Sequence, residues 1–202
     1  MSAKKITYYN SEITSGGMLF NQTKIISELI LAGLNHDEIL LKVVNENILH
    51  TLTEKVARKY ANIILRRIEH LDKKYLQYIV RGTFKDAVML LLVIIANHSR
   101  IVGDFLIFIR REYIEKNIFV LKNTSWDTYF EQCRTREVNV DAWSDSTRIK
   151  MRRVVFSILI ESGLIDSKTL SINTMHIPNI VSEYISEQDR SYERFCLQGI
   201  LI

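Results

Sequence analysis

The stretch AVMLLLVIIA, residues 87–96, is the most apolar run in the sequence, and IVGDFLIFI, residues 101–109, follows closely. Ten residues rise only about 15 Å as a helix, half the thickness of a bilayer's hydrocarbon core. His98, Arg100 and Asp104 interrupt any longer apolar span. The two runs therefore predict two buried core helices and no membrane span.

The rest of the composition favours helices as well. Of 202 residues, 47% are hydrophobic and 25% are charged, which is typical of a globular protein. One proline and seven glycines leave little turn chemistry for a fold of many hairpins. We therefore expect an all-α protein, mainly a helical bundle. Apolar periodicity places helices near residues 17–32, 36–46, 53–70, 73–81, 84–98, 101–117, 125–137, 145–162, 179–187 and 189–197.

Helix ends are also marked in the sequence. Asn35 with Glu38, and Thr51 with Glu54, have the spacing of a capping box at a helix start. Three glycines each follow an apolar-periodic segment, and each is expected to be the left-handed residue that ends a helix. These glycines are Gly33, Gly82 and Gly163.

The C-terminal part has a different pattern. Ser144 opens the helix expected at 145–162, Gly163 ends it, and LIDSKTLSINTMHIP, residues 164–178, has the β-branched pattern of a small hairpin. A helix followed by a hairpin is the order of a winged helix-turn-helix. The sequence thus predicts two units: an N-terminal helical bundle, residues 1–120, and a winged-helix-like helical unit, residues 121–202, packed on it.

The stretch TSGGMLFNQTK, residues 14–24, contains the only adjacent glycine pair. A nucleotide-binding loop would need further glycines, a Lys-Ser or Lys-Thr pair and a preceding strand, and the stretch has none of these. We interpret the pair as the lead-in to a helix, with a backbone anion site at the helix start as the alternative.

Signals for catalysis are weak. The five histidines are scattered, and Cys133 and Cys196 lie too far apart for a zinc ribbon. Nucleophile motifs and clustered carboxylates are also missing from the sequence. We expect no enzymatic activity, no catalytic residues, no metal and no cofactor. The N-terminus MSAKKITYYN lacks the apolar stretch of a secretory signal, so a cytoplasmic location is expected.

Charge is unevenly distributed along the chain. The net charge is +4 and the isoelectric point is near 9.0. Residues 55–85 hold nine basic and two acidic residues, a net charge of +7, whereas residues 154–202 hold three basic and six acidic residues, a net charge of −3. Such segregation is expected of a protein with a polyanionic partner.

The helix expected at 53–70 carries most of this charge. At 100° per residue, its apolar residues share one arc, and a basic stripe lies on the opposite arc. We predict that this stripe contacts DNA phosphates, although most charged helix faces are merely solvated. Arg67 falls within the apolar arc, where an ion pair or an interdomain contact is expected. The stripe consists of Lys55, Arg58, Lys59 and Arg66.

A second candidate surface lies on the helix expected at 145–162. Thr147, Lys150 and Arg153 face away from its apolar side, so we predict that they contact the phosphates or a groove of DNA. Arg148 and Arg152 lie at the edge of the apolar arc and are expected to support the fold instead. Many helices with a basic first half bind nothing, which is the alternative.

Several segments together resemble the BrxA family. They are Ser15-Gly16-Gly17-Met18-Leu19, NENILH (45–50), LRRIEHL (65–71), VGDFL (102–106) and STRIKMRRVVFSILIESGLI (146–165). BrxA proteins are small accessory components of BREX, the bacteriophage exclusion systems of bacteria. The likeness runs from about Tyr8 to Phe195, nearly the whole chain.

The resemblance implies an all-helical protein, similar in part to the NusB antitermination factor, that binds double-stranded DNA and has no known enzymatic activity. Two rival hypotheses remain. A NusB-like bundle would bind RNA through aromatic stacking platforms, for which Tyr8, Tyr9, Tyr75 and Tyr78 are the candidates. A protein–protein adaptor would use the basic patch to meet an acidic partner such as the defence methyltransferase or another BREX component. A metal-dependent hydrolase is a third and weaker alternative.

Overall fold

The computed structural model describes residue 9 and residues 11–136 and 138–187, and these residues are mostly helical. This confirms the predicted all-α character for the described part of the chain. The helices are η1 (Glu12–Ser15), α1 (Phe20–Leu31), α2 (His36–Glu46), α3 (Glu54–Ile68), α4 (Lys73–Arg81), α5 (Phe84–His98), α6 (Arg100–Glu112), η2 (Ile114–Lys116), α7 (Ser125–Arg136), α8 (Val138–Asp141), α9 (Asp145–Glu161) and α10 (Asn179–Glu187).

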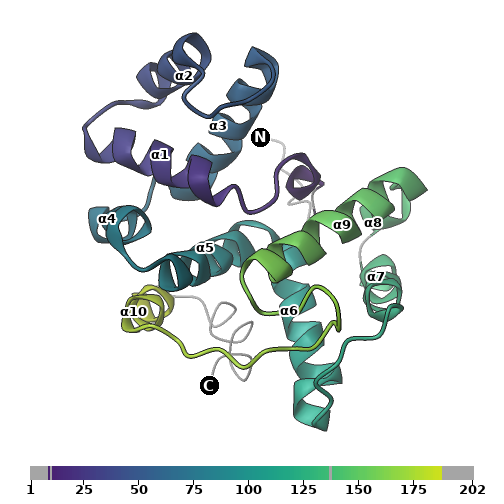
Figure 1. The fold of residues 1–202 in the computed structure, drawn as a ribbon. Helices are drawn as coiled ribbons and strands as arrows, with labels where there is room; N and C mark the ends of the chain where they lie inside the picture. Colours follow the sequence, from purple (N-terminus) through teal and green to yellow (C-terminus); the bar gives the residue numbers. More distant parts are fainter. Residues whose placement is uncertain (1–8, 10, 137, 188–202) are drawn as a thin grey trace, which may run out of the picture.

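Helix α5 lies at the centre of the fold (Figure 1). All ten residues of 87–96 are buried, so the helix is covered on every side rather than along one stripe. It contacts α3, α4 and α6 along with α9 and α10. The apolar run therefore forms a core helix, as predicted, and helices from both ends of the chain must pack on it.

The described residues contain no single helix long and apolar enough to cross a membrane. Only Phe84–His98 and Arg100–Lys116 taken together have that length and composition, and the pair is bent by 109°.

An aromatic cluster joins α6 to the C-terminal helices. The ring of Phe105 on α6 is 5.2 Å from that of Trp126 and 5.0 Å from that of Tyr129, both on α7. It also lies 5.8 Å from Phe156 on α9. Aromatic pairs at these separations add to the stability gained from burial alone. The cluster therefore fixes α7 and α9 against α6.

The helix ends follow the predicted capping chemistry in part. Asn35 and Glu38 form the capping box of α2, with each side chain accepting from the other residue's backbone N–H. Helix α3, however, is capped by Thr53, whose hydroxyl accepts from the N–H of Val56, and the prediction based on Thr51 is wrong. Thr51 instead bonds to Asn47 in the preceding turn.

Two of the three predicted left-handed glycines are confirmed. Gly33 has φ +92° and Gly163 has φ +77°, whereas Gly82 has φ −68°. A Cβ at Gly82 would lie 2.6 Å from the carbonyl oxygen of Tyr78. Gly82 therefore permits a close approach of the backbone instead of a left-handed turn.

The glycine pair leads into α1 through a contact that reaches across the fold. Helix α1 begins at Phe20, after the predicted residue 17. The guanidinium of Arg67 on α3, only 2% exposed, donates to the carbonyls of Gly17 (3.1 Å) and Gly16 (3.3 Å). Burial, with a smaller effect of the Arg66 charge, lowers the pKa of Arg67 to about 10, so it stays protonated at neutral pH. Arg67 therefore has a structural role, but its hydrogen-bond partners are backbone carbonyls of the same N-terminal part rather than the expected ion pair or interdomain contact.

The winged-helix β-hairpin predicted at residues 164–178 is not seen, and the described residues form no sheet. The reason is that the second arm of the expected hairpin donates its backbone hydrogen bonds to two different segments of the chain. Asn173 N–H donates to the carbonyl of Leu164, but Ile172 N–H donates to the carbonyl of Phe119, which precedes α7. Only isolated antiparallel bridges result, at Val120–Ser171 and Ile165–Ile172.

The other helix boundaries differ by a few residues. The helix predicted at 101–117 ends at Glu112 and is followed by η2, and the one predicted at 125–137 is α7, followed by the short α8. The helix predicted at 189–197 lies outside the described residues. The division at residue 120 falls between η2 and α7 and, like the NusB-like part of the fold, stays a prediction.

Replacing Arg67 tests the contact with the glycine pair. We expect Arg67→Met to lower the free energy of unfolding by about 2 kcal/mol, because two inward-facing carbonyls lose their charged donor. Urea unfolding followed by circular dichroism measures this. The matched control is Arg66→Met, which removes an exposed cation and is expected to change stability by about 0.5 kcal/mol or less. Equal losses in the two variants would contradict the proposed role.

Candidate nucleic-acid interface

The basic stripe lies on the outer face of α3, as its periodicity predicts. Lys55, Arg58, Lys59 and Arg66 are all exposed. The opposite face packs into the core. Its fully buried residues include Ala57, Ala61, Ile64, Leu65 and Ile68.

The four cations of the stripe differ in their partners. Within the described residues, Lys55, Arg58 and Lys59 form no ion pair with a carboxylate. Arg66 Nη1, in contrast, lies 3.5 Å from Glu12 Oε1 of η1. Three of the four are therefore available to an external anion without breaking a bond inside the protein.

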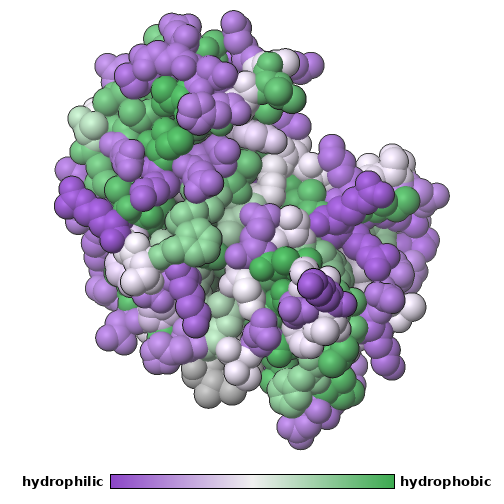
Figure 2. Space-filling model, in the orientation of Figure 1, coloured by the Kyte–Doolittle hydropathy of each residue, from purple (hydrophilic) through white to green (hydrophobic). Residues whose placement is uncertain are grey.

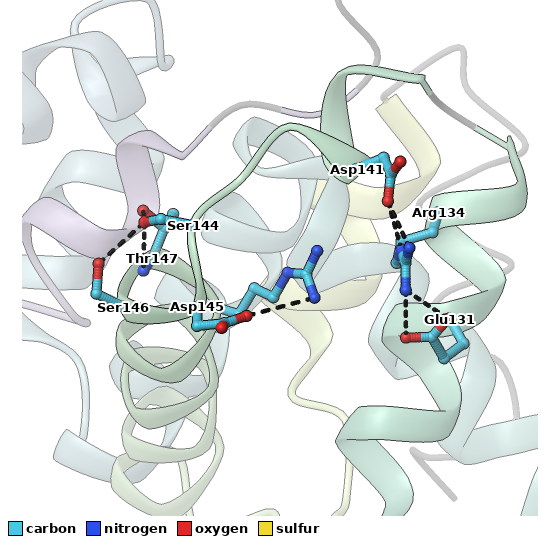
Figure 3. Close-up of polar contacts among 8 residues, drawn as sticks. Glu131, Arg134, Asp141, Ser144, Asp145, Ser146 and Thr147 are labelled. Carbon is cyan, nitrogen blue, oxygen red and sulfur yellow. Dashed lines mark hydrogen bonds and ion pairs between the residues drawn. The ribbon is translucent and has the colours of Figure 1, made fainter.

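The start of α9 is held by a network of hydroxyls (Figure 3). Ser144 Oγ accepts from the N–H of Thr147 at 3.3 Å and lies 2.9 Å from the hydroxyl of Ser146. The Thr147 hydroxyl is 3.0 Å from the same Ser144 oxygen. The structure thus places Thr147, half-buried, in the helix cap, where its amide and hydroxyl already have a partner.

Lys150 and Arg153 lie further along α9 and are exposed. No ion pair joins either of them to a carboxylate of the described residues. Arg153 stands between two hollows of the surface. One, of about 470 Å³, lies between α7 and α9, and the other, of about 700 Å³, lies between α9 and the start of α1.

Arg148 and Arg152 make the structural contacts predicted for them. Arg148 lies 3.6 Å from Asp145 and 5.2 Å from the ring of Phe130. Arg152 donates to the carbonyl of Asn123 at 2.9 Å, just before α7. Both guanidiniums therefore brace α9 against its neighbours.

The cation of Arg134 on α7 is neutralised. It contacts Glu131 at 3.0 Å and Asp141 at 2.6 Å (Figure 3). These two carboxylates remove Arg134 from the set of cations that can meet an external anion, although it lies near the start of α9.

The two basic helices meet the same segment of chain. Arg67 of α3 binds the glycine pair, η1 contacts α9, and a Cβ on Gly17 would lie 3.8 Å from the Glu161 carboxylate. From this junction the outer ends of α3 and α9 diverge (Figure 1). Figure 2 shows a notch in the outline of the molecule between the regions that α3 and α9 occupy in Figure 1.

A metal centre is not formed by the residues that the structure describes. They contain no group of three or more His, Cys, Asp and Glu side chains able to hold a metal ion.

A family model matches residues 7–189, nearly the full length of the chain. The chain belongs to the BrxA family. Proteins named BREX protein BrxA are similar to it in three organisms. The relative in Paramagnetospirillum magneticum is 29% identical over 94% of this chain and 96% of its own. That in Bacillus cereus is 28% identical over 79% and 80%, and that in Escherichia coli is 29% identical over 77% and 73%.

A solved structure is also similar to this BrxA-family chain. The crystal structure of an uncharacterized protein from Magnetospirillum magneticum has a TM-score of 0.83 at 28% sequence identity. The match covers 95% of this chain and 98% of that one. The helical arrangement described above is thus found in a second protein.

Glu12 is a residue at this candidate interface that the sequence did not reveal. Its carboxylate lies 3.5 Å from Arg66 and 3.8 Å from His98 Nε2. Glu12 precedes these partners by 54 and 86 residues, so no helical spacing connects them. Burial lowers the pKa of His98, and the charge of Arg67 lowers it further.

This environment predicts a pH dependence of stability. Because the pKa of His98 is lower in the folded state, the unfolded state takes up the proton first as the pH falls below about 6.5. We expect the free energy of unfolding to fall between pH 7.5 and 5.5, and His98→Gln to reduce that fall. Urea unfolding at both pH values measures it. His70→Gln, which removes an exposed histidine, serves as the control; the idea fails if His98→Gln behaves like the wild type.

Proposed function

We propose that this BrxA-family chain is a non-enzymatic accessory protein of a BREX phage-defence system that acts in the cytoplasm by binding double-stranded DNA. The relatives named BREX protein BrxA support the assignment to BREX. DNA binding is our inference from the surface chemistry, and it relies mainly on contacts with the phosphate backbone.

The observation that carries the proposal is a set of exposed cations without carboxylate partners in the described residues. They lie on the exposed faces of α3 and α9. A duplex that binds such groups releases its condensed counterions, which is the main source of affinity in sequence-tolerant binding. The set consists of Lys55, Arg58, Lys59, Lys150 and Arg153.

The other two residues predicted to contact DNA, Arg66 and Thr147, already have partners within the protein. Arg66 would have to exchange Glu12 for a phosphate, and this exposed pair, 3.5 Å apart, costs little to break. Thr147 belongs to the cap of α9, and its contribution would come through the helix end rather than a free hydroxyl. We therefore assign Arg66 and Thr147 smaller parts in binding.

The aromatic residues argue for duplex DNA over single-stranded RNA. Tyr9 and Tyr75 are each 2% exposed, and their hydroxyls donate to Asp104 and Glu187. Tyr78 is half-buried, and its hydroxyl donates to Asp86 at 3.2 Å. The fourth candidate, Tyr8, lies outside the described residues. Rings held in this way do not offer the open faces on which unstacked bases rest.

A salt series tests the proposal. We expect the wild-type affinity for duplex DNA to fall by about three orders of magnitude or more between 50 and 200 mM salt, since several phosphates are contacted. The alanine variant of Lys55, Arg58, Lys59 and Arg66 should bind more weakly, with a slope shallower by about 3 to 4. For the Lys150 and Arg153 double alanine variant, the slope should be shallower by about 2. Fluorescence anisotropy of a labelled duplex gives both quantities.

The control for this series is the double variant Lys42→Ala and Lys116→Ala. Both lysines are already paired, with Glu46 and Glu112, so their loss should leave the slope unchanged. Absence of wild-type binding at 50 mM salt would refute DNA binding and favour the adaptor hypothesis. Equal competition by RNA of the same length would refute the preference for duplex DNA.

A further inference from the structure

A single leucine is fully exposed at the turn that joins α2 to α3. Leu52 has a relative exposure of 101%, whereas Leu49 in the same turn is 1% exposed. A lone exposed leucine is common on protein surfaces and needs no explanation by itself. Leu52 differs from such residues in the ordered turn that carries it and in the basic residues that follow it.

The turn that carries Leu52 is held by hydrogen bonds on both sides. Asn47, in the left-handed conformation, donates its side-chain amide to the carbonyl of Thr51 (3.0 Å) and accepts from the Thr51 N–H (2.9 Å). The Thr51 hydroxyl reaches the carbonyl of Thr53 at 3.1 Å, and Thr53 caps α3. The tip is therefore ordered before any partner arrives, so little conformational entropy is lost on binding.

Leu52 also fails to make the contact usual for its position. It stands just before the cap residue Thr53, where an apolar side chain often packs on the residue five positions later, inside the helix. That residue here is Ala57, which is short and fully buried. Leu52 consequently lies fully exposed just before the start of α3.

The helix that follows this tip begins with a basic segment. Lys55, Arg58 and Lys59 lie in the first two turns of α3 and Glu54 is the one acidic residue there, a net charge of +2. The helix N-terminus adds its own partial positive charge. Figure 2 shows hydrophobic surface over the outer end of α3, with hydrophilic surface around it.

We propose that Leu52 is an apolar wedge that enters the minor groove of bound duplex DNA and bends it. Lys55, Arg58 and Lys59 hold the phosphates beside the groove. An exposed aliphatic side chain flanked by cations is the means by which minor-groove proteins part stacked base pairs. The inference rests on the DNA binding proposed above and adds to it the groove and the residue that enters it.

The test compares Leu52→Ala with the wild type on a duplex labelled at both ends. Resonance energy transfer between the labels reports bending, and anisotropy reports affinity. We expect Leu52→Ala to bind about tenfold more weakly and to lose the change in energy transfer, because the buried leucine surface is lost. The salt slope should stay that of the wild type, since a leucine displaces no counterions.

Leu41→Ala is the matched control. Leu41 is also exposed, at 59%, but its neighbours Lys42 and Glu46 neutralise each other at 3.1 Å. It should bind and bend DNA as the wild type does. Because Leu52 is fully exposed and Leu41 is mostly exposed, neither variant is expected to disturb folding, and urea unfolding checks this.

The outcomes separate the wedge from DNA binding itself. If the wild type binds the duplex and Leu52→Ala binds and bends it equally well, the wedge is refuted and DNA binding stands. If the wild type does not bind the duplex, both proposals fail. Vesicles of phosphatidylglycerol and phosphatidylcholine provide a further arm. Loss of vesicle binding in Leu52→Ala with unchanged duplex binding would overturn the wedge in favour of a lipid surface.

Discussion

The burial of α5 on every side is the constraint on which the fold depends. Ten consecutive apolar residues need cover all round, and no single neighbouring helix can supply it. Helices α3 and α4 cover it from the N-terminal part, while α6, α9 and α10 complete the cover from later in the chain. The two helices that carry the unpaired cations are among these covering helices. Their outer faces are therefore displayed by a rigid core rather than by mobile loops.

Polar contacts then decide how these two helices are placed. Arg67 bonds the glycine pair to α3, and the same segment of chain, through η1, lies against α9. Arg148 and Arg152 brace α9, so they serve the fold although they are cations. A cation is thus structural when it has a partner inside the protein, and available to an external anion when the described residues give it none. This difference separates Lys150 and Arg153 from arginines next to them in sequence.

Helical periodicity was sufficient to predict the core helices and the exposure of the α3 stripe, because both depend on spacing within one element. Features that depend on distant partners were not predictable. The expected hairpin failed since Ile172 bonds to Phe119, and Arg67 and Arg66 found their partners about fifty residues away. Leu52 was missed for the opposite reason. The sequence assigned the cap to Thr51, which would place Leu52 inside the helix, whereas the cap is Thr53 and Leu52 precedes it.

The bond between Tyr9 and Asp104 joins residues that are 95 positions apart. At the usual speed of protein synthesis, the ribosome makes Asp104 roughly 5 to 20 s after Tyr9. During that interval Tyr9 lacks its hydrogen-bond acceptor, since α6 has not yet been made. The segment that contains Tyr9 and η1 therefore reaches its final position late. The arrangement of α3 and α9, which both contact this segment, is completed only after much of the chain has been translated.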